Sequence, residues 1–286
     1  MFNLLLAIVS SSLVSVMMRI GEGRAKNNIS MLSVNYFICM VLSFFYTGMD
    51  NLFQSGEGVS TAISLGSING IFYIVSLILF QNSIRKNGVV LSSIFMKLGI
   101  MMPLIISIVL FKEMPNVFQV IGFVIALTAI IMINLKEPTG SLEIKDLKRK
   151  NQGKVSLIFV LIGCGMADGM SKIYQELGTE QFEELFLVFT FVIAFVLSII
   201  LVVYKKQKFT INEFIYGALL GLPNYYSARF LLKALGEIPA VVAYPTFSIG
   251  TIAVITITGI IIFKEKITRM QMFAVGLIAI AVVMLN

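Results

Sequence analysis

Long apolar runs separated by short polar loops are the feature of this sequence that most constrains its fold. Hydrophobic residues occupy 58% of the 286 positions, charged residues occupy 13%, and the mean hydropathy is +0.94. A soluble domain has about 45–50% apolar and about 25% charged residues, so a soluble core of this size cannot bury so much apolar surface. We therefore expect the excess apolar surface to face lipid.

Ten of these runs are long enough to be predicted as transmembrane helices. Lipid offers the backbone no hydrogen-bond partners, so each run that crosses it is expected to be helical. The first run is not expected to be a cleaved signal peptide, because its basic residues Arg19, Arg24 and Lys26 follow the run instead of preceding it. The predicted spans are 2–20, 30–48, 62–82, 88–111, 116–135, 154–174, 183–204, 212–234, 239–263 and 268–285.

The spans fall into two halves that resemble each other. A polar linker at 136–153, which includes a candidate short surface helix, separates five spans in 1–135 from five in 154–286. A gap-free shift that moves position 111 to position 263 places Phe111-Lys112-Glu113 on Phe263-Lys264-Glu265. The same shift places Tyr73, Val89-Val90, Phe95 and Gln119 on Tyr225, Val241-Val242, Phe247 and Gln271.

The number of spans in each half decides the predicted topology. Five is odd, so the second copy must enter the membrane from the side opposite to the first, which is the plan of many alternating-access transporters. We therefore predict an all-α membrane protein whose ten transmembrane helices form two inverted five-helix repeats.

Basic residues are concentrated in the loops after the odd-numbered spans, and acidic residues in the loops after the even-numbered ones. The positive-inside rule places loops rich in Lys and Arg in the cytoplasm. Both chain ends are therefore expected on the outer side of the cell membrane. Residues behind this asymmetry include Arg85, Lys86, Lys205, Lys206 and Lys208 on the basic side and Glu176, Glu180, Glu183 and Glu184 on the acidic side.

The sequence disfavours several function classes. The formal net charge is +7, but the basic residues lie in short loops, so no nucleic acid partner is expected. Cys39 and Cys164 fall inside apolar runs, where no disulfide is expected, and there is no His. No phosphate-binding Gly-x-x-x-x-Gly-Lys-Ser/Thr loop occurs. We therefore expect no metal, no cofactor, no enzymatic activity and no ATP-driven pumping by the chain itself.

Two matching helix ends and the five-plus-five arrangement carry a family resemblance. The ends read Val-Leu-Phe-Lys-Glu at 109–113 and Ile-Ile-Phe-Lys-Glu at 261–265, and a small-residue or Pro turn such as Pro239-Ala240 opens the helix before them. This pattern resembles the drug/metabolite transporter superfamily, and within it the EamA-like ten-helix members. Two features depart from the family, since Lys-Glu stands where Gly-Glu is common and the first span has no Trp. The resemblance covers nearly the whole chain and implies two inverted repeats around a central cavity for small solutes.

Three charged residues, Lys97, Asp168 and Arg229, fall inside predicted spans, where charge is costly and usually faces a cavity or a partner. Lys97 is interpreted as a contact for a substrate anion or a proton-coupling group, or else as a lysine that snorkels or binds helix-end carbonyls. Asp168 suits cation binding or proton coupling, and Arg229 suits a carboxylate or phosphate. Asp168 and Arg229 are expected at similar depth, so a structural ion pair near the outer rim is the alternative for both.

Polar and aromatic residues inside the spans form a second group of candidates. Pro frees backbone carbonyls that can bind a solute beside a cavity, and Tyr rings can hold a cationic or aromatic solute. The alternative for each residue is interhelical hydrogen bonding or kink geometry. The substrate-pathway candidates are Asn69 and Tyr73 in the third span, Asn224 and Tyr225 in the eighth, and Tyr244 in the ninth. Gly163, Gly165 and Gly169 of the sixth span are expected to form a close-packing surface.

The expected function is secondary active transport of a small polar metabolite, amino acid-like or an organic cation or drug, across the cytoplasmic membrane by alternating access. The cavity is expected between the first, third and fourth spans of one half and the sixth, eighth and ninth spans of the other. The alternatives are a translocator of a lipid-linked headgroup or phosphorylated solute, and a non-transporting sensor or intramembrane enzyme. The expected partners are a small solute, the lipid bilayer and a coupling proton or other ion; both a monomer and a homodimer fit the sequence.

Overall fold

The structure of the protein is a computed structural model. It describes residues 1–22, 24–52, 56, 58–87, 95–96, 99, 101–134 and 144–261, together with 273, 276–277, 280 and 284. These residues form helices and loops and no strand, which confirms the predicted all-α class. A helix satisfies its own backbone hydrogen bonds, and a chain that meets lipid requires this.

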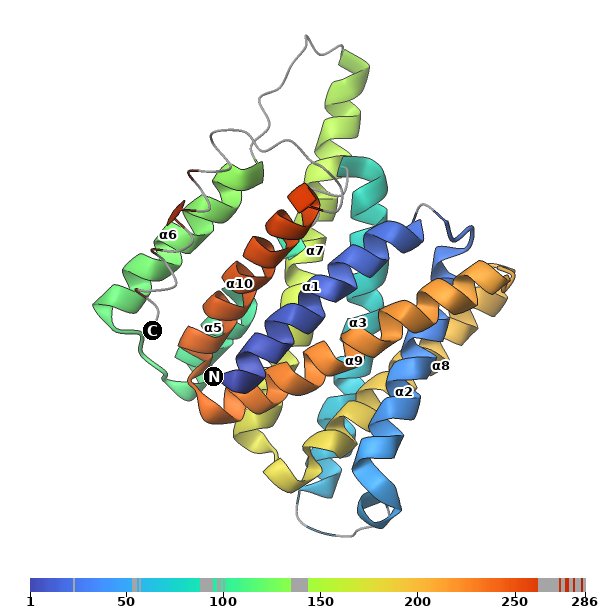
Figure 1. Ribbon diagram of the computed structural model, residues 1–286, viewed down its shortest axis with the longest axis horizontal. Helices are drawn as coiled ribbons and strands as arrows, with labels where there is room; N and C mark the ends of the chain where they lie inside the picture. The colour runs from blue at the N-terminus through green and yellow to red at the C-terminus, as the bar shows by residue number, and fades with distance from the viewer. Residues whose placement is uncertain are drawn as a thin grey trace. The chain divides into compact units, whose positions relative to one another are not determined.

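Nine α-helices and one short 3₁₀ helix lie within the described residues (Figure 1). The α-helices are α1 (Phe2–Glu22), α2 (Asn28–Leu52), α3 (Val59–Asn87), α5 (Met101–Phe111), α6 (Val117–Asn134), α7 (Ile144–Leu177), α8 (Glu183–Tyr204), α9 (Ile211–Glu237) and α10 (Ala240–Ile261), and the 3₁₀ helix is η1 (Glu180–Phe182). The last turn of α2 is set off by Gly48, whose φ of 71° lies in the left-handed region that Gly tolerates.

Most helix ends lie close to the predicted ends, and α8 coincides with the predicted span 183–204. The largest difference is α7, which begins at Ile144, so residues 144–153 of the predicted linker continue the sixth span as helix. That stretch is rich in Lys, Arg and Gln, which are good helix formers. Much of the predicted span 88–111 and nearly all of 268–285 lie outside the described residues, so the count of ten helices and the inverted arrangement stay predictions.

Four of the described helices are long and apolar enough to cross a membrane, over Asn28–Gly48, Val59–Ser83, Val155–Leu177 and Glu180–Tyr204. Helix α6 also presents an apolar face to its surroundings. Val117, Val120, Ile121 and Val124 recur at helical spacing and are all exposed. A contiguous exposed apolar stripe of this kind needs an apolar environment, which lipid supplies.

The chain forms two compact units. Unit 1 consists of Met1–Ile74 and Met170–Ile238, and unit 2 consists of Val75–Gly169 and Pro239–Asn286. Within unit 1, α2 packs against α8 and α9, and α1 packs against α9 (Figure 1). Within unit 2, α10 packs against α5 and α6. Each unit therefore joins a segment of the first sequence half to a segment of the second.

Two glycines four residues apart let α9 approach the backbone of α2. A Cβ atom placed on Gly217 would lie 2.6 Å from the carbonyl oxygen of Met31, and one on Gly221 would lie 2.8 Å from the carbonyl oxygen of Asn35. Neither site has room for a methyl group. Such close backbone contact is a main source of helix association in lipid.

A second glycine pair brings α3 onto α8 in the same way. A Cβ atom on Gly66 would lie 2.5 Å from the carbonyl oxygen of Phe186, and one on Gly70 would lie 2.5 Å from that of Thr190. Unit 1 therefore contains two Gly-x-x-x-Gly contacts, each between a helix of the first sequence half and one of the second.

A buried carboxylate ties the loop after α1 to the start of α9. Glu213 is fully buried and forms a capping box with Thr210, whose backbone N lies 2.9 Å from the carboxylate. The backbone N atoms of Lys26 and Asn27 also donate to Glu213, at 2.8 and 2.9 Å. The carboxylate therefore offsets its desolvation with hydrogen bonds from two separate chain segments.

Close packing also occurs in unit 2, as the glycines of the sixth span predict. A Cβ atom on Gly165 would overlap the carbonyl oxygen of Gly99, and one on Gly169 would lie 2.7 Å from Ile106 of α5. A Cβ atom on Gly163 would lie 3.0 Å from Leu79 of α3. The predicted close-packing surface on α7 is confirmed.

We predict that Gly217→Ala lowers the melting temperature of the purified protein. The added methyl group would meet the Met31 carbonyl and the Val34 side chain at 2.6 Å, and overpacking of this kind costs about 1–3 kcal/mol. Thermal melting followed by circular dichroism measures the effect. Gly276→Ala is the control, because a Cβ there meets nothing within 4 Å. A Gly217→Ala protein that melts at or above the wild-type temperature would contradict the close contact.

Candidate functional site

An ion pair between Arg229 of α9 and Glu184 of α8 is the centre of the polar interior of unit 1. The Nε of Arg229 donates to Oε1 of Glu184, and the two side chains are 16% and 18% exposed. The hydroxyl of Tyr225 donates to the other oxygen, Oε2, at 2.8 Å. Both carboxylate oxygens are therefore bound, and both partners come from the helix that the α2 contact holds in place.

Aromatic rings surround the Arg229 guanidinium. Its Cζ atom lies 3.9 Å from the ring centroid of Tyr46, within the range of a cation–π interaction. Tyr46 also stacks on Tyr225, with centroids 5.7 Å apart, and shares a 3.0 Å hydrogen bond with the hydroxyl of Tyr226. We call Glu184, Arg229, Tyr46, Tyr225 and Tyr226 the arginine cluster.

Two predicted residues on α3 lie beside α8, next to this cluster. The ring of Tyr73 packs edge-on against Phe191, and Phe191 in turn contacts Tyr225. Asn69 is buried, and its Nδ2 lies 3.5 Å from the hydroxyl of Thr190. Its Oδ1 has no hydrogen-bond partner among the described residues. Tyr73 is thus connected to the arginine cluster through one ring.

The predicted Asn224 faces α2 and not the arginine cluster. Its Nδ2 donates to Oδ1 of Asn35 at 3.1 Å and lies 3.7 Å from Sγ of Cys39. The Cys39 thiol, fully buried, donates to the carbonyl oxygen of Gly221 at 3.3 Å. Asn224 therefore contacts α2, and its role in a substrate pathway stays a prediction.

Two further predicted residues, Asp168 and Tyr244, meet in unit 2. The buried hydroxyl of Tyr244 donates to the backbone carbonyl oxygen of Asp168 at 2.6 Å, and Asp168 is half-buried on α7. Helix α10 runs through Pro245, and α9 through Pro223, without a break. Lys97 lies outside the described residues.

Sequence reasoning missed Glu184 and Tyr46. Glu184 was assigned to an acidic outer loop, but it lies in the first turn of α8, where a carboxylate also interacts favourably with the helix dipole. The available signal was its position at the start of a long apolar run. Another ion pair lies in α7, where Lys172 is 2% exposed and pairs with Glu176 one turn away.

A polar pocket of about 450 Å³ adjoins the arginine cluster in unit 1. Its wall comes from the starts of α1 and α8 and the ends of α7 and α9, together with η1. It has more carboxylates than cations, and we call it the acidic pocket. The lining residues are Asn3, Gln175, Glu180, Glu183, Glu184, Arg229, Lys233, Gly236 and Glu237.

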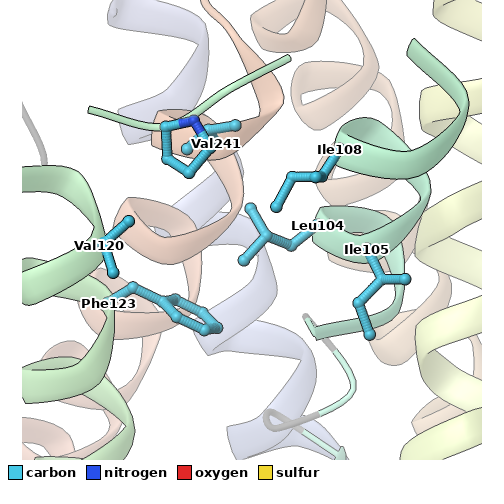
Figure 2. A pocket seen from close by; sticks show the side chains of 7 residues that line it. Leu104, Ile105, Ile108, Val120, Phe123 and Val241 are labelled. Atoms are coloured by element: carbon cyan, nitrogen blue, oxygen red, sulfur yellow. The ribbon is translucent and has the colours of Figure 1, made fainter. Parts of the chain in front are cut away.

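Unit 2 contains a different pocket, apolar and about 260 Å³ in volume. In Figure 2, Leu104 and Ile108 of α5 face Val120 and Phe123 of α6, and Val241 of α10 lies behind them. The polar candidates of the sequence are not among its lining residues, which also include Ile105 and Pro115. A pocket without a polar group cannot orient a polar solute.

Sequence comparison links both halves of the chain to transporter families. Residues 1–135 match the EamA-like transporter family, and residues 182–278 match the Small Multidrug Resistance protein family. An uncharacterized protein of Haemophilus influenzae is 26% identical over 280 residues, which are 95% of this chain and 92% of the relative.

The fold also has a counterpart among solved structures. A crystal structure matches 99% of this chain and 94% of its own chain, with a TM-score of 0.74 and 12% sequence identity. At that identity the likeness shows the fold alone. Transporter families matched in both halves, together with membrane-length apolar helices in the described residues, confirm the predicted resemblance to the drug/metabolite transporter superfamily and indicate a multi-pass membrane protein.

Proposed function

We propose that the protein is a secondary active transporter that moves a small polar solute, amino acid-like or an organic cation, across the cytoplasmic membrane by alternating access. The observation that carries the proposal is the arginine cluster, an ion pair held among helices of a transporter fold and bordered by an open polar pocket. Charged groups in such helices are costly and usually line a solute or ion pathway.

The pairing of helices supports the predicted repeat. Helices α2 and α8 end at Leu52 and Tyr204, and helices α3 and α9 begin at Val59 and Ile211. The two members of each pair are as far apart in sequence as Phe111 and Phe263. The contact of α9 with α2 and that of α3 with α8 are therefore counterparts, and each uses a Gly-x-x-x-Gly pair. Two matched halves that pack in this manner suit two alternating states.

The charge of the acidic pocket bears on the solute. Four lining residues are Glu, against one Arg, one Lys and the Met1 ammonium group that pairs with Glu237, so the remaining charge is negative and disfavours a phosphate group. This argues against a lipid-linked headgroup or phosphorylated solute and for a zwitterion or a cation. Coupling to a proton or other ion, outer chain ends and a pathway role for Lys97, Asp168, Asn69, Tyr73 and Tyr244 belong to the same proposal.

We predict solute flux in liposomes that contain the full-length protein. A panel of radiolabelled amino acids and organic cations, tested with a proton or sodium gradient in either direction, is expected to include a solute that enters faster than in empty liposomes. Arg229→Lys, which keeps the charge but loses the planar fork, is expected to slow that flux at least about tenfold. Lys205→Ala, in the exposed turn after α8, is the control and should transport normally. No flux of any panel member under either gradient would refute the proposal.

We also predict a measurable coupling between Arg229 and Glu184. Removing either partner leaves the other charge without its counterion, and because the pair is only partly buried we expect a loss of about 1–3 kcal/mol, below that of a fully buried pair. The double variant Glu184→Gln/Arg229→Gln should lose less stability than the sum of the two single variants. Additive losses in a thermal double-mutant cycle would show that the pair is not coupled.

A further inference from the structure

The acidic pocket contains charges that are already paired and charges that are not. Glu184 is held by Arg229 and Tyr225, and Glu237 accepts a hydrogen bond from Asn3. The arginine cluster thus neutralises the carboxylate on the side of the pocket next to Arg229. Three charged side chains remain to be explained, namely Glu180, Glu183 and Lys233.

Glu183 is the least expected of these groups. It is 8% exposed and lines the pocket, yet no hydrogen bond or ion pair to its carboxylate occurs within the described part of the chain. The nearby charges of Glu180 and Glu184 oppose its own, and those of Lys233 and Arg229 favour it without forming an ion pair. A nearly buried carboxylate without a donor is costly and calls for a partner from outside the chain.

A second unsatisfied acceptor belongs to Gln175, a residue that lines the same pocket. Oε1 of Gln175 is buried and has no hydrogen-bond partner among the described residues. Gly236 lies next to the Gln175 amide, since a Cβ placed on this glycine would lie 3.1 Å from the Gln175 Nε2. Two acceptors without a partner, both on residues that line one cavity and one of them a carboxylate, favour a ligand that is a cation and a hydrogen-bond donor.

We propose that the acidic pocket binds the primary ammonium group of a small solute, with the Glu183 carboxylate and Gln175 Oε1 as its acceptors. An ammonium group supplies three N–H donors and one positive charge. The cavity volume of about 450 Å³ suits a small solute. A quaternary ammonium has no N–H to donate, and the Tyr46 ring that would otherwise hold it is already covered by Arg229. The inference rests on the proposed function only for the further step that the bound solute is also transported.

The test measures binding to the purified full-length protein by isothermal titration calorimetry. The probes are n-butylamine and L-alanine, each compared with its N-trimethylated counterpart at equal concentration. The primary amines are expected to bind at least about tenfold more tightly than the trimethylated compounds. This comparison uses the wild-type protein, so it does not depend on the folding of a variant. No binding of either primary amine, or equal binding of the methylated forms, would overturn the proposal.

Variants locate the site. Glu183→Gln and Gln175→Leu are each expected to weaken binding of both primary amines, the former at least about tenfold. Glu180→Gln removes the same charge from an exposed position on the pocket wall and is expected to change affinity much less. Equal losses in Glu180→Gln and Glu183→Gln would indicate a diffuse acidic field and overturn the assignment of Glu183. Circular dichroism melting checks that each variant is folded.

The natural ligand could supply its ammonium group as an amino acid or as a simple amine, and the variant Lys233→Met distinguishes the two. If the natural ligand is an amino acid, Lys233 binds its carboxylate, and the variant weakens the binding of L-alanine but not that of n-butylamine. If the ligand is a simple amine or polyamine, the variant weakens neither; both results support the ammonium site. Binding without flux of the same probe would leave the pocket assignment intact and count against its place in transport. Flux of a probe that does not bind at this pocket would support transport and count against the pocket assignment.

Discussion

Helices in lipid gain little by covering one another's apolar side chains, because the acyl chains around them are equally apolar. Their association depends on close backbone contact and on hydrogen bonds between helices, and α9 combines the two on one face. Gly217 and Gly221 lie against α2, and Tyr225, one turn further along, donates to Glu184 of α8. The glycine contact holds α9 against α2, whose Tyr46 ring covers the Arg229 guanidinium, so one side of the arginine cluster depends on this contact.

Run length and composition predict the helices well where an apolar run ends in a clear polar signal. The run that became α8 ends at Tyr204, directly before Lys205 and Lys206, and its predicted bounds coincide with the observed ones. The predicted span 154–174 agrees with the apolar part of α7, Val155–Leu177, and the charged stretch before it, a candidate surface helix in the sequence, continues the same helix back to Ile144 because its residues favour helix. Hydropathy marks where a helix meets lipid and does not mark where a helix begins in water.

The candidate site was predictable in part. Arg229 and Tyr225 were identified because charged and aromatic residues stand out inside an apolar run. Their partner Glu184 lies 45 residues away from Arg229 in sequence and opens a different helix, and nothing in a single sequence specifies which helix faces which. The same limit explains why Asn224, next to Tyr225 in sequence, contacts α2 instead of the arginine cluster. Neighbours along a helix point in directions about 100° apart, so their roles separate.

Cys39 gives the α2–α9 contact an internal reporter. Its thiol is fully buried and donates to the carbonyl of Gly221, one of the two glycines that contact α2. A water-borne maleimide can reach this sulfur only after the two helices have parted. The rate at which maleimide alkylates Cys39 therefore measures how often α2 and α9 separate. Once the other cysteine, Cys164, is replaced, the measurement needs no introduced cysteine.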